Sequence, residues 1–370
     1  MQRRQLPSWS EFQQLSPAEK VESWSQGEGR LWHCLHAKQF DRKFLDGLYE
    51  LTNIIRSLSK ARAGSLFLQS LLPHKRAMLY FMQPSTRTYL SFKTACEILG
   101  IRTSDVRDAS TSSEVKGETF EDTIRTFSSY FEFIIMRHSG EGMAELAAHC
   151  LDTSDRSVPV LNAGSGKDQH PTQALLDVYT LRRSFESCGG LEGKTILFAG
   201  DLLRGRTVRS LARLLTLFPG VKIVFASPEK FRMKDDVLAI LRASGTSYVE
   251  TTDFLGHLKD ADAIYMTRVQ DEHDNKDGTK SEKSFPEFSL RAEHLDILKP
   301  HCAIMHPLPR RDELAVEIDN NPRAKYWRQE RNGMWTRAAL IAHISGVDRE
   351  IFAYWSELCR QAHHTAETKR

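Results

Sequence analysis

Short apolar runs alternate with helix-patterned segments along most of this chain, and this alternation limits the possible folds. The strand-sized apolar runs are Ala77–Met82, Phe133–Met136, Val158–Asn162, Thr195–Ala199, Val221–Ala226, Ala263–Met266 and Ala303–Met305. The segments between them keep helical spacing, as in Phe92, Ala95 and Leu99. Strands that are apolar throughout are buried on both faces, and strands separated by helices usually pair in parallel. The sequence therefore predicts an α/β fold built from parallel sheets flanked by helices.

The length of 370 residues favours two domains of similar size, each with its own core. A Gly-rich break at 184–194 separates a helix from a new strand and marks the boundary. We expect a first domain over residues 40–184 and a second over 185–335, with the helical segment 336–370 packing back onto the first. In such folds ligands lie beyond the carboxyl ends of the strands, so we expect the active site in the interdomain cleft.

Residues 1–39 differ from the rest of the chain and form a separate N-terminal extension. They contain Trp9, Trp24 and Trp32, half of the six tryptophans. They also contain Ser16-Pro17-Ala18-Glu19, which combines a capping box with proline at the first helical position. The extension should form short helices that pack on the main body, and binding of a partner is the alternative.

Composition excludes several classes of protein. Lys and Arg number 51 against 48 Asp and Glu, which leaves a net charge of +3 and argues against nucleic-acid binding. No apolar run approaches the ~20 residues that a membrane span needs. Residues 1–7 carry charge without an apolar signal segment, and the six cysteines include no Cys-x-x-Cys pair. We therefore expect a cytoplasmic protein with reduced thiols and no metal site.

Three segments resemble nucleotide- or metal-binding motifs but lack essential residues. Gly164-Ser-Gly-Lys167 is followed by Asp168 where a phosphate loop needs Ser or Thr for magnesium. The segment 200–205 supplies only two glycines of a dinucleotide fingerprint. His273 stands where a calcium loop would begin with Asp. Nucleotide hydrolysis, hydride transfer and calcium binding all lose support.

The segment Met82-Gln-Pro-Ser-Thr-Arg-Thr88 lies between a predicted strand and a predicted helix. Hydroxyl groups and a guanidinium at a helix N-terminus suit an anion, because backbone N–H groups, the helix dipole and a bidentate Arg converge there. A simple helix cap is the alternative. One cap needs one hydroxyl, however, and Ser85, Thr86 and Thr88 supply three. We therefore predict an anion site here.

This segment begins a series of motifs that resembles the aspartate/ornithine carbamoyltransferase family over about residues 40–340. After Ser85-Thr-Arg-Thr88 the series continues in the family's order with Lys116-Gly-Glu-Thr119, Met136-Arg-His138, Asn162-Ala-Gly164, His170-Pro-Thr-Gln173, Asp201-Leu-Leu-Arg-Gly-Arg-Thr207, Thr267-Arg-Val-Gln270, His306-Pro-Leu-Pro-Arg310 and Asn332-Gly333. Any single match could arise by chance, whereas the whole ordered series could not.

The late motifs resemble those of the aspartate-type members. His306-Pro-Leu-Pro309 stands where ornithine-type members have a His-Cys-Leu-Pro segment, and Thr267-Arg-Val-Gln270 is also similar to the aspartate type. The chemistry agrees, because aspartate offers two carboxylates whereas the side chain of ornithine is a cation. Arg206 and Arg268, each just beyond a strand of the second domain, suit such a dicarboxylate.

The resemblance implies transfer of the carbamoyl group of carbamoyl phosphate to the α-amine of L-aspartate, without a metal or a cofactor. The implied carbamoyl-phosphate ligands are Ser85, Thr86, Arg87, Thr88, Ser112, Lys116, Arg137, His170, Gln173, Leu308 and Pro309. The implied aspartate ligands are Lys116, Arg206, Arg268 and Gln270. The implied catalytic residues are Arg87, Thr88, Lys116, Arg137 and His170, which position two anionic substrates and stabilise a tetrahedral oxyanion. His170 is also well placed to cap the helix that follows it.

The resemblance further implies a homotrimer in which Ser112 and Lys116 reach into the site of a neighbouring subunit. Lys116 would otherwise be read as a solvated loop residue. The polar segment after Gln270 should then close over the substrate. Whether a regulatory chain or another pathway enzyme binds is left open.

One residue departs from the family pattern, because Gln83 stands where members usually have an acidic residue or lysine, which predicts altered domain closure. Two other functions remain. The first is transfer to another amine such as ornithine. The second is a catalytically silent homologue that acts as a scaffold, although Lys116, Arg137 and His170 are all present.

Overall fold

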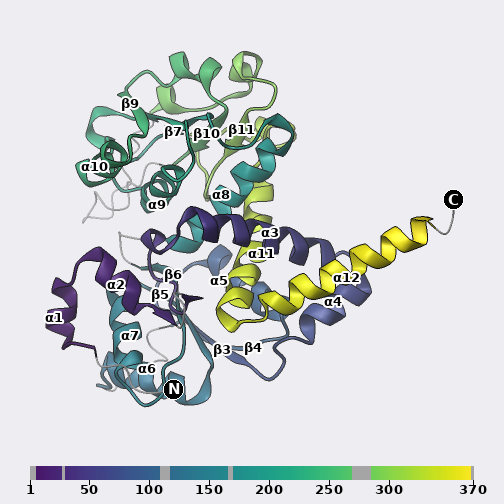
Figure 1. Cartoon of the computed structure of the whole chain (residues 1–370). Coiled ribbons are helices and arrows are strands. Elements are labelled where there is room, and N and C mark those ends of the chain that lie inside the picture. Colours follow the sequence, from purple (N-terminus) through teal and green to yellow (C-terminus); the bar gives the residue numbers. More distant parts are fainter. Residues whose placement is uncertain (1–5, 27–29, 109–116, 166–169, 269–284, 368–370) are drawn as a thin grey trace. The chain divides into compact units, whose positions relative to one another are not determined.

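The computed structural model of the chain describes residues 6–26, 30–108, 117–165, 170–268 and 285–367 (Figure 1). It contains two compact units, one made of Met1–Thr172 with Gly333–Arg370 and the other of Gln173–Asn332. We call them unit 1 and unit 2. Two helices cross the boundary, α8 (Pro171–Phe185) and α11 (Tyr326–Ser345). The units thus divide at the start of α8, whereas the sequence prediction put the domain boundary at its end.

A four-stranded parallel sheet forms the centre of unit 1. Its order is β4 (Arg102–Val106), β3 (Arg76–Phe81), β5 (Phe133–His138) and β6 (Val160–Ser165). Its helices include α3 (Arg42–Leu58), α4 (Arg62–Gln69), α5 (Thr86–Ile98), α6 (Phe120–Tyr130) and α7 (Met143–Asp152). After β3 the chain adds β4 on one side and then β5 on the other. This reversal makes the carboxyl ends of β3 and β5 the expected place for a ligand.

The sheet of unit 1 is covered on both faces, as the apolar strands predict. Met78 and Tyr80 of β3 belong to a cluster that also contains Ile124 of α6 and Ala147 of α7. The alternate residues of β3 are buried as well, since Leu79 has no exposed surface. Side chains on a strand point alternately to the two faces, so burial of both sets requires cover on both.

Unit 2 contains a five-stranded parallel sheet. Its order is β11 (Ala303–Met305), β10 (Ala263–Met266), β7 (Thr195–Ala199), β8 (Lys222–Ala226) and β9 (Ser247–Thr251). It also contains α9 (Arg206–Leu215), α10 (Asp235–Ser244) and the short helices η4 (Glu186–Cys188), η5 (Glu229–Phe231), η6 (Leu255–Asp260), η8 (Pro286–Phe288), η9 (Ala292–Ile297) and η10 (Val316–Ile318). The chain reverses direction across this sheet between β7 and β10, which pair directly.

The N-terminal segment packs on unit 1, in agreement with the prediction of accessory helices. It forms α1 (Trp9–Gln14), α2 (Pro17–Ser23), the short pair β1 (Ser25–Gln26) and β2 (Arg30–Leu31), and η1 (Ala37–Gln39). The predicted capping box is confirmed, because Ser16 and Glu19 cap α2 reciprocally. Cys34 then pairs in parallel with β6 at Leu161, so the segment continues the sheet of unit 1.

The C-terminal pattern splits into two helices, as the Ser345-Gly346 interruption suggested. Gly346 adopts φ +84 between α11 and α12 (Asp348–Glu367), a conformation that glycine tolerates best. α12 packs on α3 (Figure 1). The ring of Tyr354 stacks on Phe67 of α4 at a centroid distance of 3.8 Å.

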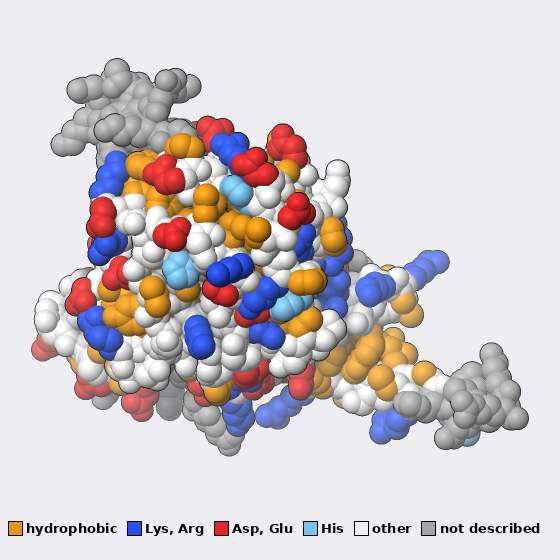
Figure 2. Space-filling model, turned by 90° about the horizontal axis from the view of Figure 1, so that it is seen from above, with side chains coloured by type: hydrophobic (Ala, Val, Ile, Leu, Met, Phe, Trp, Pro, Cys, Tyr) orange, Lys and Arg blue, Asp and Glu red, His pale blue; other side chains and the backbone are white. Residues whose placement is uncertain are grey.

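The prediction of the fold class is confirmed, although two strands of the main sheets were missed. The apolar runs overlap β3, β5, β6, β7, β8, β10 and β11, but no predicted run covers β4 or β9. On the face shown in Figure 2, cationic and anionic side chains are interspersed with apolar ones, as a net charge of +3 leads one to expect. Among the described helices, none combines the length and apolarity required to span a membrane.

Candidate active site

The predicted anion-binding segment lies where β3 ends and α5 begins. Ser85 is the N-cap of α5 in an extended conformation, yet its side chain makes no capping hydrogen bond. The simple cap was the alternative to an anion site, so this geometry favours the anion. Thr88 is buried on the first turn, while Arg87 is exposed. The first N–H groups of a helix have no partner within the helix, so this turn presents donors to an anion.

Arg137 lies on the neighbouring strand, at the same edge of the sheet. It pairs in register with Phe81, and its carbonyl oxygen accepts a hydrogen bond from the N–H of Gln83 at 3.3 Å. The guanidinium is buried and donates from Nη1 to the carbonyl oxygen of Ala163 at 3.1 Å. The structure therefore places Arg137 beside the segment that joins β3 to α5.

His170 immediately precedes α8 and is 4% exposed. The strand before it, β6, is irregular near its end, where its register with β5 shifts between Met136 and His138. Asn162 Oδ1 accepts from the N–H of Gly164 at 2.8 Å, while its Nδ2 donates to the carbonyl oxygen of Leu35 at 3.0 Å. Asn162 thus supports the irregular end of β6, which contains Ala163, the acceptor of Arg137.

Arg206 and Arg268 follow adjacent strands of unit 2. Arg206 is the first residue of α9, after β7, and Arg268 comes shortly after β10. The two strand ends are in close contact, because a Cβ atom at Gly200 would lie 2.1 Å from the carbonyl oxygen of Thr267. Only glycine fits there. Arg206 and Arg268 therefore both follow strands that meet at the reversal point of the sheet, and burial lowers the pKa of Arg206.

The predicted backbone ligands Leu308 and Pro309 lie in a turn after β11. The Leu308–Pro309 peptide is cis, and Leu308 is the one non-glycine among the described residues with positive φ, at +52. The N–H of Leu308 donates to Nδ1 of His306 at 2.7 Å. Nε2 of His306 therefore carries the proton and donates to Oε1 of Glu313 at 2.8 Å. His306 thus holds the turn rather than facing a substrate.

A buried carboxylate beneath this turn was not predicted. Asp177 lies one helical turn after Gln173 on α8 and accepts from its Nε2 at 3.0 Å. It also accepts from Gln329 Nε2 at 2.7 Å and from the Tyr265 hydroxyl at 2.8 Å. The spacing of Gln173 and Asp177 could have indicated this contact, because residues four apart share a helix face. No local pattern could have indicated Gln329.

Three predicted site residues, Ser112, Lys116 and Gln270, lie outside the described residues. The same is true of the polar segment that follows Gln270 up to residue 284. The other predicted residues fall into two groups, each at the carboxyl edge of one sheet. Unit 1 holds Ser85, Thr86, Arg87, Thr88, Arg137 and His170, and unit 2 holds Gln173, Arg206, Arg268, Leu308 and Pro309.

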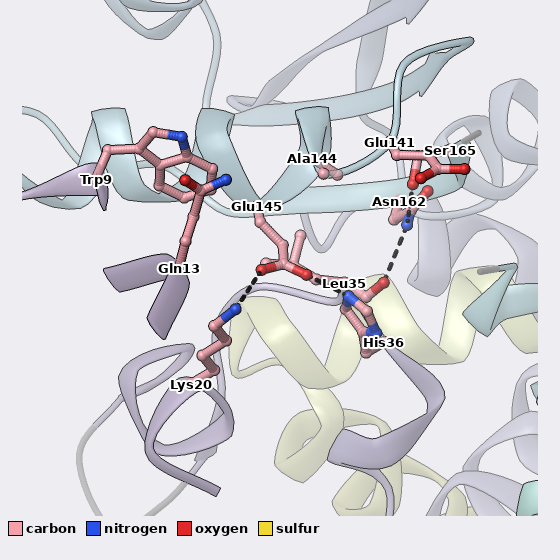
Figure 3. Close-up of a pocket in the computed structure, with 11 residues that line it drawn as sticks. Trp9, Gln13, Lys20, Leu35, His36, Glu141, Ala144, Glu145, Asn162 and Ser165 are labelled. Atoms are coloured by element: carbon pink, nitrogen blue, oxygen red, sulfur yellow. Dashed lines mark hydrogen bonds and ion pairs between the residues drawn. The ribbon is translucent and has the colours of Figure 1, made fainter. Parts of the chain in front are cut away.

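A separate cavity of about 290 Å³ lies in unit 1 between the N-terminal segment and α7 (Figure 3). Glu145 of α7 accepts from His36 at 2.5 Å and pairs with Lys20 at 3.6 Å. Burial raises the pKa of Glu145, but the contacts with His36 and Lys20 outweigh it and lower the pKa overall. Asn162 and its bond to Leu35 form another wall of the cavity (Figure 3). The charged groups of Lys20, His36 and Glu145 thus pair with each other. The contacts around the cavity connect the N-terminal segment to α7 and β6.

Known proteins match both units. The carbamoyl-P binding domain of the aspartate/ornithine carbamoyltransferases matches residues 32–183, and their Asp/Orn binding domain matches residues 192–344. The chain is 40% identical to aspartate carbamoyltransferase 1, chloroplastic, of Pisum sativum over 310 residues, which cover 83% of this chain and 77% of that protein.

Two solved structures are similar as well. The catalytic subunit of M. Jannaschii aspartate transcarbamoylase has a TM-score of 0.75 at 35% identity and covers 85% of this chain and 98% of that chain. The Trypanosoma cruzi enzyme in complex with carbamoyl phosphate and aspartate has a TM-score of 0.73 at 32% identity, with coverage of 87% and 97%. The resemblance in the motifs is confirmed: the chain belongs to the aspartate/ornithine carbamoyltransferase family.

Proposed function

We propose that this chain transfers the carbamoyl group of carbamoyl phosphate to the α-amine of L-aspartate, giving N-carbamoyl-L-aspartate and phosphate, a step of pyrimidine biosynthesis. The observation that carries the choice of acceptor is the placement of Arg206 and Arg268 after the adjacent strands β7 and β10. Two guanidinium groups at one sheet edge suit the two carboxylates of aspartate. The Trypanosoma cruzi relative supports the choice, because it was solved with both substrates.

Unit 1 binds the other substrate. The first turn of α5, with Ser85, Thr86, Arg87 and Thr88, holds the phosphate group of carbamoyl phosphate. Arg137 lies beside this turn and bridges the phosphate and the carbonyl oxygen.

His170 donates to the same carbonyl oxygen. Attack by the amine places negative charge on this oxygen, so donors fixed in advance lower the barrier. Loss of one such donor typically costs about 10²–10³ in kcat. We therefore expect His170→Ala to reduce kcat by about 100-fold with little change in the aspartate KM.

The carbamoyl NH₂ group needs acceptors, and unit 2 supplies them. The carbonyl oxygens of Leu308 and Pro309 lie in the turn that His306 holds, and Gln173 Oε1 is the third acceptor. The chemistry needs only positioning and charge stabilisation, so the proposal includes neither a metal nor a cofactor.

The test is an assay of phosphate release with carbamoyl phosphate and either aspartate or ornithine. We expect turnover with aspartate alone. Arg268→Ala should raise the aspartate KM by about 10- to 100-fold, since it removes a charge-assisted contact worth about 1.5–3 kcal/mol. Arg242→Ala, which removes an exposed arginine paired with Asp235 on α10, is the matched control. Turnover with ornithine would overturn the acceptor assignment, and no turnover with either would favour a silent scaffold.

A homotrimer with shared sites is part of the proposal. In it Ser112 and Lys116 complete the site of a neighbouring subunit. Leu90, on α5 just beyond the anion-binding turn, is 51% exposed, and a neighbouring subunit would cover this apolar side chain. Mixing inactive Lys116→Ala and inactive Arg137→Ala chains after dissociation should restore activity, because mixed trimers contain some intact sites. No recovery, or a monomer by ultracentrifugation, would contradict the shared site.

We propose a cytoplasmic location. In support, all six cysteines are unpaired thiols, which suits a reducing compartment. The Pisum sativum relative is named chloroplastic, so the location needs its own test. Fractionation of cells that express the full-length protein would decide it. Any regulatory chain or pathway enzyme that binds the protein should copurify with it from such cells.

A further inference from the structure

Asp177 has the contacts of a residue that orients ligand-binding groups. Its carboxylate has no exposed surface and accepts three hydrogen bonds. Two donors are the side-chain amides of Gln173 and Gln329, which both reach Oδ1. The third is the Tyr265 hydroxyl, which reaches Oδ2 and also hydrogen-bonds to the side chain of Thr207. All five residues belong to unit 2.

The bond to Asp177 decides which way the amide of Gln173 points. An amide side chain has one donor end and one acceptor end, and the two are nearly equal in shape. A carboxylate only accepts, so it binds the Nε2 end of Gln173. The Oε1 end is left for another partner. An acceptor is what a carbamoyl NH₂ group requires.

The same carboxylate fixes a second amide in the same way. Gln329 donates from Nε2 to Asp177 and accepts through Oε1 from the N–H of His306 at 3.0 Å. His306 in turn accepts the N–H of Leu308. Asp177 is therefore connected both to Gln173 and to the turn that carries the carbonyl oxygens of Leu308 and Pro309.

We propose that Asp177 is a positioning residue of the carbamoyl-phosphate site, which orients the Gln173 amide and the 306–309 turn as acceptors for the carbamoyl NH₂ group. The inference rests on the proposed function and names the residue that holds these acceptors in place. Asp177 touches no substrate; it acts through Gln173 and Gln329.

A purely structural role explains this carboxylate less well. Burial of an ionised group is costly, and an apolar side chain of similar size would fill the space without that cost. Burial raises the pKa of Asp177 to about 7, although its three donors oppose the rise. Tyr265 and Glu330 are the titratable groups that act on it: the hydrogen bond from the Tyr265 hydroxyl lowers the pKa of Asp177, whereas the negative charge of Glu330 raises it. To accept hydrogen bonds from two amides at once, the side chain needs an oxygen atom, which an apolar residue lacks.

The experiment measures KM and kcat for both substrates in three variants of the full chain. Asp177→Leu removes both acceptor oxygens. Asp177→Asn keeps one oxygen for the two amides and turns an NH₂ group toward Tyr265. Asp262→Leu is the matched control: Asp262 is a buried carboxylate of the same unit, but it lies just before β10 and accepts from the N–H of Thr195, at the amino ends of the strands.

We expect Asp177→Leu to raise the KM for carbamoyl phosphate by about 10- to 100-fold, the usual effect of losing a residue that orients a ligand group. Asp177→Asn should return the KM for carbamoyl phosphate most of the way to the wild-type value. Asp262→Leu should lower the melting temperature without changing the KM. The double variant Asp177→Leu with Gln173→Ala should be no worse than Asp177→Leu alone, because both changes remove the same acceptor.

An unchanged KM in Asp177→Leu, or equal effects of Asp177→Leu and Asp262→Leu, would overturn the inference. If Asp177→Leu fails to fold, Gln329→Met tests the branch to the turn and should raise the same KM, whereas an unchanged KM would again overturn it. A wild-type chain that does not turn over carbamoyl phosphate and aspartate would contradict the proposed function instead. The two failures are therefore distinguishable.

Discussion

Replacement of Asn162 by alanine should destabilise unit 1 through two backbone groups. Asn162 is 1% exposed and accepts a hydrogen bond from the N–H of Gly164. Its side-chain amide also donates to the carbonyl oxygen of Leu35 (Figure 3). A buried group that loses its partner costs about 1–3 kcal/mol, so the two together predict a loss of about 2–6 kcal/mol in the free energy of unfolding. Ser165→Ala is the matched control. It removes only the 3.2 Å contact with Asn162 and should cost about 1 kcal/mol or less.

Urea unfolding followed by tryptophan fluorescence is the suitable assay. Unit 1 contains every tryptophan except Trp327, so the signal reports mainly on this unit. The KM for carbamoyl phosphate should rise in parallel, because the irregular end of β6 contains the Ala163 carbonyl that accepts from Arg137. If Asn162→Ala costs no more than Ser165→Ala, the end of β6 does not depend on this side chain and the reasoning is wrong.

Three further predictions concern stability. Phe12→Ala should lower the free energy of unfolding by about 3 kcal/mol, because it opens a cavity under the N-terminal helices. Limited proteolysis of this variant should then cut the N-terminal segment first, and unchanged cleavage would contradict the prediction. Burial raises the pKa of Asp177 from 3.8 to about 7, so the protonated side chain stabilises the fold and this stabilisation is lost as pH rises through the interval. Asp177→Asn should therefore flatten the dependence of the free energy of unfolding on pH between these values. Burial also raises the pKa of Asp348, but bonds from His343 and Arg30 outweigh it and lower the pKa to about 2. The stabilisation from Asp348 should therefore be lost as pH falls from 3.8 to 2, and thermal melting of Asp348→Asn over this range checks it.

The sequence predicted the strands that are buried along their length better than the partly exposed ones. β7, β10 and β11 begin and end where their apolar runs do, because strands covered on both faces are apolar throughout. The missed strands β4 and β9 are the last strands of their sheets. Their side chains are partly or fully exposed, so their sequences are polar and show no continuous run. Such strands are identified only by their backbone hydrogen bonds to the neighbouring strand, which the sequence pattern does not reveal.

A similar division applies to the site. Ser85, Arg137 and Arg268 lie in short motifs at strand ends, so their placement could be predicted from the chain alone. The partners that hold them are distant in sequence. Gln329, for example, contacts Asp177 across 152 residues, and neither residue lies in a motif that reveals the other. Such contacts depend on the packing of whole elements, which no local pattern encodes.

The division of the chain between the units has a consequence for the order of folding during synthesis. Unit 1 is discontinuous: its sheet edge needs Cys34 beside Val160, and α12 packs on α3. Unit 2 is one continuous stretch, Gln173–Asn332. At about 5–20 residues per second, the ribosome releases all of unit 2 before the last helices of unit 1 exist. The aspartate-binding half should therefore be complete first, and the half that begins the chain should be the last to close.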